Sequence, residues 1–190
     1  MKNKWFIIAV LFPALSFSQE NASRSSFNTV ASLGIIAGES TAKPLFQVVS
    51  GLSYKNWFTG IGIGLDYFNF KSIPLFADVK MKFGKAGSAF LYADGGYNFS
   101  FDNKRQFPGF IQPTSNRFLG GMYMDAGVGY RVKINSFHHF SFSAGYSRKN
   151  IVNRVSYKSS CPTGNCPDEV YKYHYSMGRI VTKVSWEFGK

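Results

Sequence analysis

The sequence predicts an all-β protein, an antiparallel up-and-down transmembrane β-barrel of eight strands. Two observations indicate this class. Many segments alternate apolar and polar side chains, as strands with two different faces do, and the chain contains 18% aromatic residues and 19 glycines. Beyond residue 18, no apolar stretch reaches the about 20 residues of a membrane-spanning helix. A sheet that crosses lipid must close into a barrel, because lipid offers no hydrogen-bond partners to an open edge.

Eight alternating segments can be read along the chain, each long enough for a tilted transmembrane strand of about 9–11 residues. An even number of strands places both chain ends on one side of the membrane. Connections on that side are short, whereas two on the other side, Asp102–Arg117 and Arg148–Lys172, are long. The expected strands are Phe27–Ala37, Leu45–Lys55, Trp57–Phe68, Pro74–Phe83, Ala89–Phe101, Phe118–Ile134, His139–Ser147 and Tyr173–Phe188.

The last strand has the clearest alternation in the chain. From Arg179 to Phe188, one face carries mostly apolar side chains and the other mostly polar or charged ones. A terminal strand that ends in an aromatic residue resembles the C-terminal assembly signal of bacterial outer-membrane β-barrel proteins. In that family Phe is usually the last residue, whereas here Gly189 and Lys190 follow it. The resemblance implies an outer-membrane location, a monomer, and contact between this strand and the assembly machinery of the outer membrane.

The N-terminus has the pattern of a secretory signal peptide. Lys2 and Lys4 precede the apolar run Trp5–Phe17, and the small residues Ser16 and Ser18 occupy positions −3 and −1 of a cleavage site after Ser18. We therefore expect residues 1–18 to be removed on export and residues 19–190 to form a single barrel domain.

Alternation alone does not tell a membrane barrel from a soluble, exported, lipocalin-like binding barrel, whose apolar face would point inward. Gly60, Gly62 and Gly64 all fall on the polar face, which suits a crowded interior better than a solvated surface. Aromatic residues lie near strand ends, as in the girdles at membrane interfaces. These features favour the membrane barrel.

The polar faces carry charges of both signs. An eight-stranded barrel is only wide enough to be filled by its own side chains, and charges removed from water must be paired. The sequence therefore predicts a lumen closed by an ion network, with neither a diffusion pore, which needs about 16 strands, nor a pair of catalytic carboxyl groups. The residues of this network are Asp66, Asp78, Lys80, Lys82, Asp94, Asp125, Arg131, Arg179 and Lys183.

The chain is basic, with a formal net charge of +12, or +10 without Lys2 and Lys4. An exported barrel has little access to nucleic acid, and the sequence holds no nucleic-acid motif. The phosphates of lipopolysaccharide are the natural counter-charge at the outer surface. A solvated basic loop without a ligand is the alternative. The predicted anion-binding surface consists of Arg148, Lys149, Arg154 and Lys158, all in the second long connection.

Two further residue pairs carry possible chemistry. Cys161 and Cys166 lie in a predicted outer loop of an exported protein, which favours a disulfide; the surrounding residues offer too few further ligands for a metal site. His174 and Ser176 share one face of the last strand and resemble the His-x-Ser arrangement of the outer-membrane lipid A 3-O-deacylases. Such a pair could act as base and nucleophile, but Met177 follows the Ser where that family has Asn.

The chain as a whole resembles the small, porin-like outer-membrane β-barrel proteins. The resemblance implies a non-enzymatic protein with a structural or surface-binding role, in contact with lipopolysaccharide or a surface protein partner and without a cofactor. The alternatives are a lipid A-modifying esterase and the soluble binding barrel.

Overall fold

A computed structural model describes residues 25–39, 41–84, 87–101, 115–135, 137–157 and 169–189. The predicted signal peptide, Lys158, Cys161 and Cys166 lie outside these residues. Among the residues that the structure describes, no helix is long and apolar enough to cross a membrane. The strands are β1 (Ser25–Ala37), β2 (Ala42–Tyr54), β3 (Trp57–Asp66), β4 (Ser72–Phe83), β5 (Ala89–Ser100), β6 (Ser115–Leu119), β7 (Gly121–Lys133), β8 (His138–Tyr157) and β9 (Glu169–Gly189).

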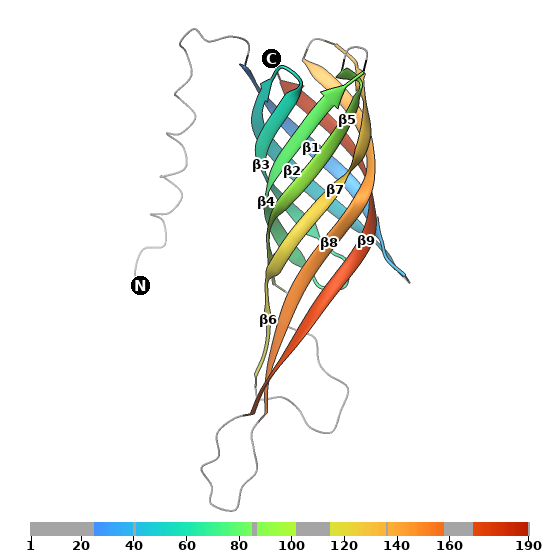
Figure 1. The fold of residues 1–190 in the computed structure, drawn as a ribbon. Coiled ribbons are helices and arrows are strands. Elements are labelled where there is room, and N and C mark those ends of the chain that lie inside the picture. The colour runs from blue at the N-terminus through green and yellow to red at the C-terminus, as the bar shows by residue number, and fades with distance from the viewer. Residues whose placement is uncertain are drawn as a thin grey trace, which may run out of the picture.

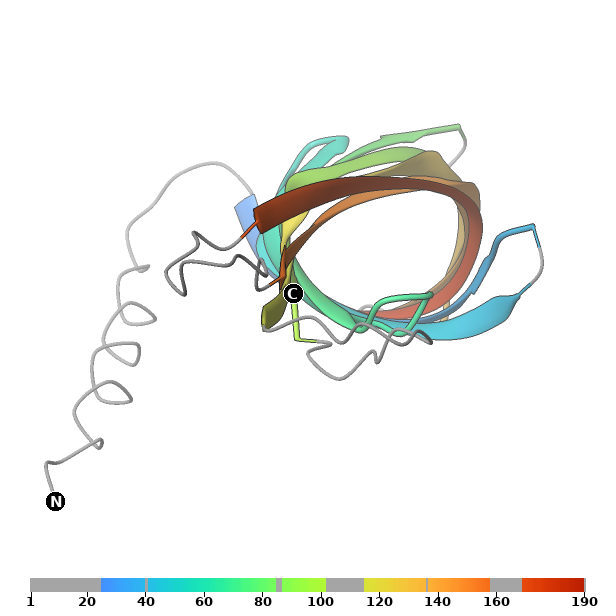
Figure 2. The ribbon, with the colours of Figure 1, turned by 90° about the horizontal axis from the view of Figure 1, so that it is seen from below.

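The strands form one closed antiparallel barrel (Figures 1 and 2). The strands β1 to β5 pair in chain order, and β5 pairs with β7. Both β6 and β7 pair with β8, β8 pairs with β9, and β1 closes the ring by pairing with β9. Because β6 and β7 are separated only by Gly120, they count as one interrupted strand of the barrel. The barrel therefore has the predicted eight strands.

The connections differ at the two ends of the barrel. The end that holds the start of β1 and the end of β9 has the short turns β2–β3, β4–β5 and β7–β8. The tightest of these needs only Lys55 and Asn56, and Lys55 adopts the left-handed conformation with φ of 52°. The predicted difference between the two ends is therefore present.

The second long connection was predicted too long. The segment Arg148–Lys172 was expected to be a loop, but β8 continues to Tyr157 and β9 begins at Glu169, and the two strands pair over this whole length. β1 pairs with β9 only as far as Ile180, so the paired parts of β8 and β9 beyond that point project past the barrel (Figure 1). We call β6, Arg148–Tyr157 of β8 and Glu169–Gly178 of β9 the ribbon.

The wall of the barrel has its apolar side outside. Large apolar side chains on alternate positions are exposed; Leu33, Ile61 and Ile180, for example, each have more than 60% of their surface accessible. Most of the intervening positions are buried or half-buried, and they include most of the charged residues of the strands. A soluble lipocalin-like barrel would have the opposite arrangement. This surface is suited to contact with hydrocarbon.

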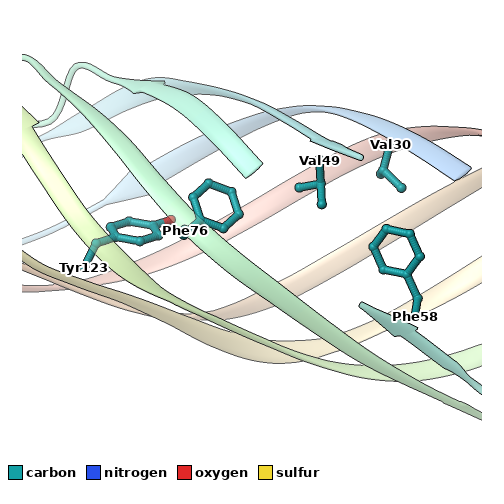
Figure 3. Close-up of a cluster of buried hydrophobic side chains, with 5 residues drawn as sticks. All are labelled: Val30, Val49, Phe58, Phe76 and Tyr123. Atoms are coloured by element: carbon teal, nitrogen blue, oxygen red, sulfur yellow. The ribbon is translucent and has the colours of Figure 1, made fainter. Parts of the chain in front are cut away.

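The interior combines an apolar cluster with polar groups. Val30, Val49, Phe58, Phe76 and Tyr123 come from five strands and lie inside the barrel (Figure 3). The predicted crowding on the glycine-bearing face of β3 is real: a Cβ atom on Gly62 would lie 2.5 Å from the Phe76 ring and 2.9 Å from Val49.

Candidate functional site

Three groups of charged side chains lie along the interior, and the first closes the end that carries the ribbon. One carboxylate oxygen of Asp66, Oδ2, forms salt bridges with two cations. Arg179 Nη1 lies 2.5 Å from it and Lys149 Nζ lies 3.0 Å from it. All three side chains have 0% exposure. Arg179 also donates to the Ser147 hydroxyl at 2.9 Å. We call Asp66, Arg179 and Lys149 the outer cluster.

The outer cluster also holds the β3–β4 turn across the mouth of the barrel. Lys149 Nζ donates to the backbone carbonyls of Phe68 and Phe70, both at 2.9 Å. Asp66 accepts the backbone N–H of Phe68 at 2.8 Å. The Phe68 ring packs with Ile36, Leu45 and Val181 inside the barrel, while Phe70 packs with residues of the ribbon. This turn therefore covers the mouth with two buried aromatic rings.

The second group lies at mid-barrel around Lys183, and we call it the central cluster. Lys183 Nζ is 3.0 Å from Asp125 and 3.5 Å from Asp94. It lies 4.2 Å from the centroid of the Tyr92 ring, and Tyr92 donates to Asp125 at 3.0 Å. The cavity beside these groups has a volume of about 10 Å³, which is room for one water molecule at most.

The third group, the inner cluster, lies toward the short turns. Glu187 is 2.9 Å from Arg131 and 3.6 Å from Lys82. Asp78 and Lys80 form a further pair at 3.2 Å between the inner and central clusters.

All nine residues predicted to face the lumen point inward, because strand side chains alternate strictly. Lys149 was assigned wrongly: it was predicted to be on the anion-binding surface, but it is buried in the outer cluster. Gln47 and Tyr123 also join the central polar network, with a Gln47–Tyr123 hydrogen bond of 2.8 Å. Their inward parity was readable from the sequence, but neutral side chains carry no charge pattern that draws attention to them.

The other two described residues of the predicted anion-binding surface are exposed. Arg148 and Arg154 lie on the outward face of the ribbon, and Arg148 Nε donates to the Ser176 hydroxyl at 3.0 Å. Arg154 is the cross-strand neighbour of Arg117 on β6 and of Lys172 on β9. These three cations therefore share one row, and no carboxylate occupies an outward position in the part of the ribbon that the structure describes.

The outward face of the ribbon also carries His174 and Ser176. They pair with Val152 and Asn150 on β8, which places both residues beyond the last β9 residue paired with β1. The hydroxyl of Ser176 is engaged by Arg148, and no carboxylate contacts His174 in the described residues. Glu169 is the only carboxylate in the part of the ribbon that the structure describes, and it accepts a hydrogen bond from the Tyr171 hydroxyl at 2.8 Å. This hydrogen bond raises the pKa of the Tyr171 phenol.

Comparison with known proteins finds similar structures but no similar sequences. No protein-family model matches the chain, and no curated protein sequence matches it significantly. The outer-membrane protein OprG from Pseudomonas aeruginosa has a TM-score of 0.56 and 9% identity, over 87% of this chain and 95% of that chain. The outer-membrane protein AlkL, solved in lipid bilayers, has a TM-score of 0.47 and 9% identity, over 92% and 95%.

The likeness to OprG shows a shared fold. With its closed eight-stranded barrel and its apolar outer wall, the chain has the fold of a small outer-membrane β-barrel. The apolar outer wall of this fold is suited to contact with lipid.

Proposed function

We propose that this protein is a non-enzymatic, monomeric outer-membrane barrel with a closed lumen, whose ribbon binds the phosphates of lipopolysaccharide. The leader of residues 1–18 would direct its export, and the C-terminal strand would be read by the outer-membrane assembly machinery. The role is structural or adhesive, and a surface protein is the alternative partner for the ribbon.

The observation that carries this proposal is the row of three cations on the ribbon. Arg117, Arg154 and Lys172 are cross-strand neighbours, and like charges in such positions destabilise a sheet. A bound anion removes that repulsion. Phosphate is suited to this site because arginine side chains bind it with two parallel hydrogen bonds.

The test is binding of lipopolysaccharide to the purified protein in detergent, measured at several salt concentrations. Changing Arg117, Arg154 and Lys172 together to Gln should weaken binding by about tenfold or more, because charge-assisted hydrogen bonds are lost. The salt dependence of binding should also fall.

The matched control removes three charges elsewhere. Lys43, Lys71 and Lys133 are exposed and lie outside the ribbon, so their change to Gln lowers the net charge equally and should leave binding almost unchanged. Equal losses in the two triple variants would mean that only net charge matters, and unchanged binding in the ribbon variant would end the proposal.

The esterase alternative gives a second prediction. Because Arg148 engages Ser176 and no acid orients His174 in the described residues, purified protein should leave the acyl chains of lipid A intact. Mass spectrometry of lipid A after incubation measures this. Deacylated product that disappears in Ser176→Ala would establish the enzyme instead.

A further inference from the structure

The outer wall of the barrel contains a hollow of about 840 Å³ formed by β7, β8, β9 and β1. Its floor is made by Ala144 on β8 and Thr182 on β9, which are cross-strand neighbours. These small side chains lie in one row between the larger Ile35 and Val128. The adjacent row is bulky throughout and forms one side of the hollow; it consists of Leu33, Val184, Phe142 and Tyr130.

The hollow lies near the middle of the membrane. Thr182 precedes Phe188, at the end of β9 next to the short turns, by six residues, or about 20 Å along the strand at ~3.3 Å per residue. With a strand tilt of about 35–45°, this is roughly 15 Å of depth, half of the ~30 Å hydrocarbon core. Because the apolar wall faces lipid, the hollow is open to acyl chains.

A cation stands on the same face, toward the ribbon. Arg148 follows Ala144 by four residues on β8, about 13 Å along the strand, and both side chains point outward. Its Nε is held by Ser176, whereas its two terminal nitrogens have no hydrogen-bond partner among the described residues. Tyr146, between Ala144 and Arg148, lies over Gly178, where a Cβ atom would collide with the Tyr146 hydroxyl. The tyrosine is thus turned toward the ribbon.

We propose that the hollow holds one acyl chain of lipid A, the lipid part of lipopolysaccharide, while Arg148 binds a phosphate of the same molecule. This proposal rests on the proposed function, because it places the same ligand on the wall below the basic row. The distance between Arg148 and the hollow fits the reach of chains from one leaflet, which is about half of the ~30 Å core. Hydrocarbon already surrounds the wall, so the hollow selects a chain by shape and close packing.

The experiment fills the hollow without changing any charge. Ala144→Trp occupies the floor, and Ala93→Trp is the matched control, since Ala93 is also exposed on the outward face but lies on β5, outside the lining of the hollow. Native mass spectrometry of the full-length mature protein in detergent measures binding of intact lipid A and of its fully deacylated, phosphorylated disaccharide. Heat-modifiable migration on a gel verifies folding, and the smaller change Thr182→Leu serves if Ala144→Trp does not fold.

Ala144→Trp should weaken binding of intact lipid A by about fivefold through lost chain packing, with no effect on the deacylated disaccharide. Ala93→Trp should change neither, and Arg148→Gln should weaken both ligands. Intact lipid A bound equally by Ala144→Trp and wild type would overturn the acyl-chain site, and the basic row could still be tested by the triple variant. A dimer that is lost in Ala144→Trp would overturn it too, because a second copy would then fill the hollow.

Discussion

Two adjacent residues on β8 show that a shift of one position along a strand decides whether a side chain is buried or exposed. Arg148 points outward and is exposed, whereas Lys149 points inward with 0% of its surface accessible. The buried ammonium is tolerated because Asp66, Ser72 and two backbone carbonyls surround it. Two basic residues at neighbouring positions therefore have opposite roles: Arg148 lies on the outer surface, and Lys149 is part of the buried outer cluster.

Asp66 is the residue whose loss we expect to be most damaging. In Asp66→Ala, the buried cations Arg179 and Lys149 lose their shared counter-charge, which should cost about 3–5 kcal/mol of stability. Urea unfolding in detergent micelles, followed on gels by heat-modifiable migration, measures this. Glu39→Ala, at an exposed acid without an ion pair in the described residues, should be neutral. A loss below 1 kcal/mol in Asp66→Ala would contradict the outer cluster as an essential ion group.

The interior charges could be predicted from sequence because a strand repeats every two residues. Asp66, Asp78 and Asp94 needed only the parity of their strands. The role of Lys149 could not be predicted, because Arg148–Lys172 was read as a loop, where parity has no meaning. Which cation meets which acid was also hidden, because it depends on the register between strands such as β3 and β9 that are distant in the chain.

At the scale of the element, β8 and β9 show where alternation fails as a signal. The part of β8 between His139 and Ser147 has outward apolar residues because it faces lipid. Beyond Arg148 the outward positions include Asn150 and Arg154, as expected of a part that leaves the membrane and meets water. A strand that crosses from one solvent to another loses its apolar row without losing its hydrogen bonds, and its pattern then resembles that of a loop.

The ribbon should be separable from the barrel. Ile151 and Tyr175 are cross-strand neighbours, so residues 152–174 can be replaced by a short Gly-Ser turn. We expect this variant to fold, since the strands of the barrel keep their pairing. It should lose most lipopolysaccharide binding, since Arg154 and Lys172 are removed and Arg117 loses its cross-strand neighbour. Heat-modifiable migration and a binding assay measure the two results. Unchanged binding would place the anion site elsewhere.

At the scale of the whole molecule, the three charged clusters and the β3–β4 turn together support a lumen that does not conduct. A hydrated ion needs a continuous water path, and the described cavity beside Lys183 has room for one water at most. Purified protein in planar lipid bilayers should give no stable channels. Large, stable conductance steps from wild type would reject the closed lumen.

The seam between β1 and β9 has a consequence for how the protein is made. It pairs Asn28 with Gly189 and Ala37 with Ile180. The first strand to be synthesised can therefore complete its pairing only after the last strand has been made. Contacts this far apart in the chain form slowly, since the entropy of closing a long loop must be lost before the pairing is gained. Until that moment each unfinished sheet has two open edges that could pair with any other strand. We therefore expect the chain to reach its membrane unfolded and shielded from other strands, and the barrel to close in a single late step.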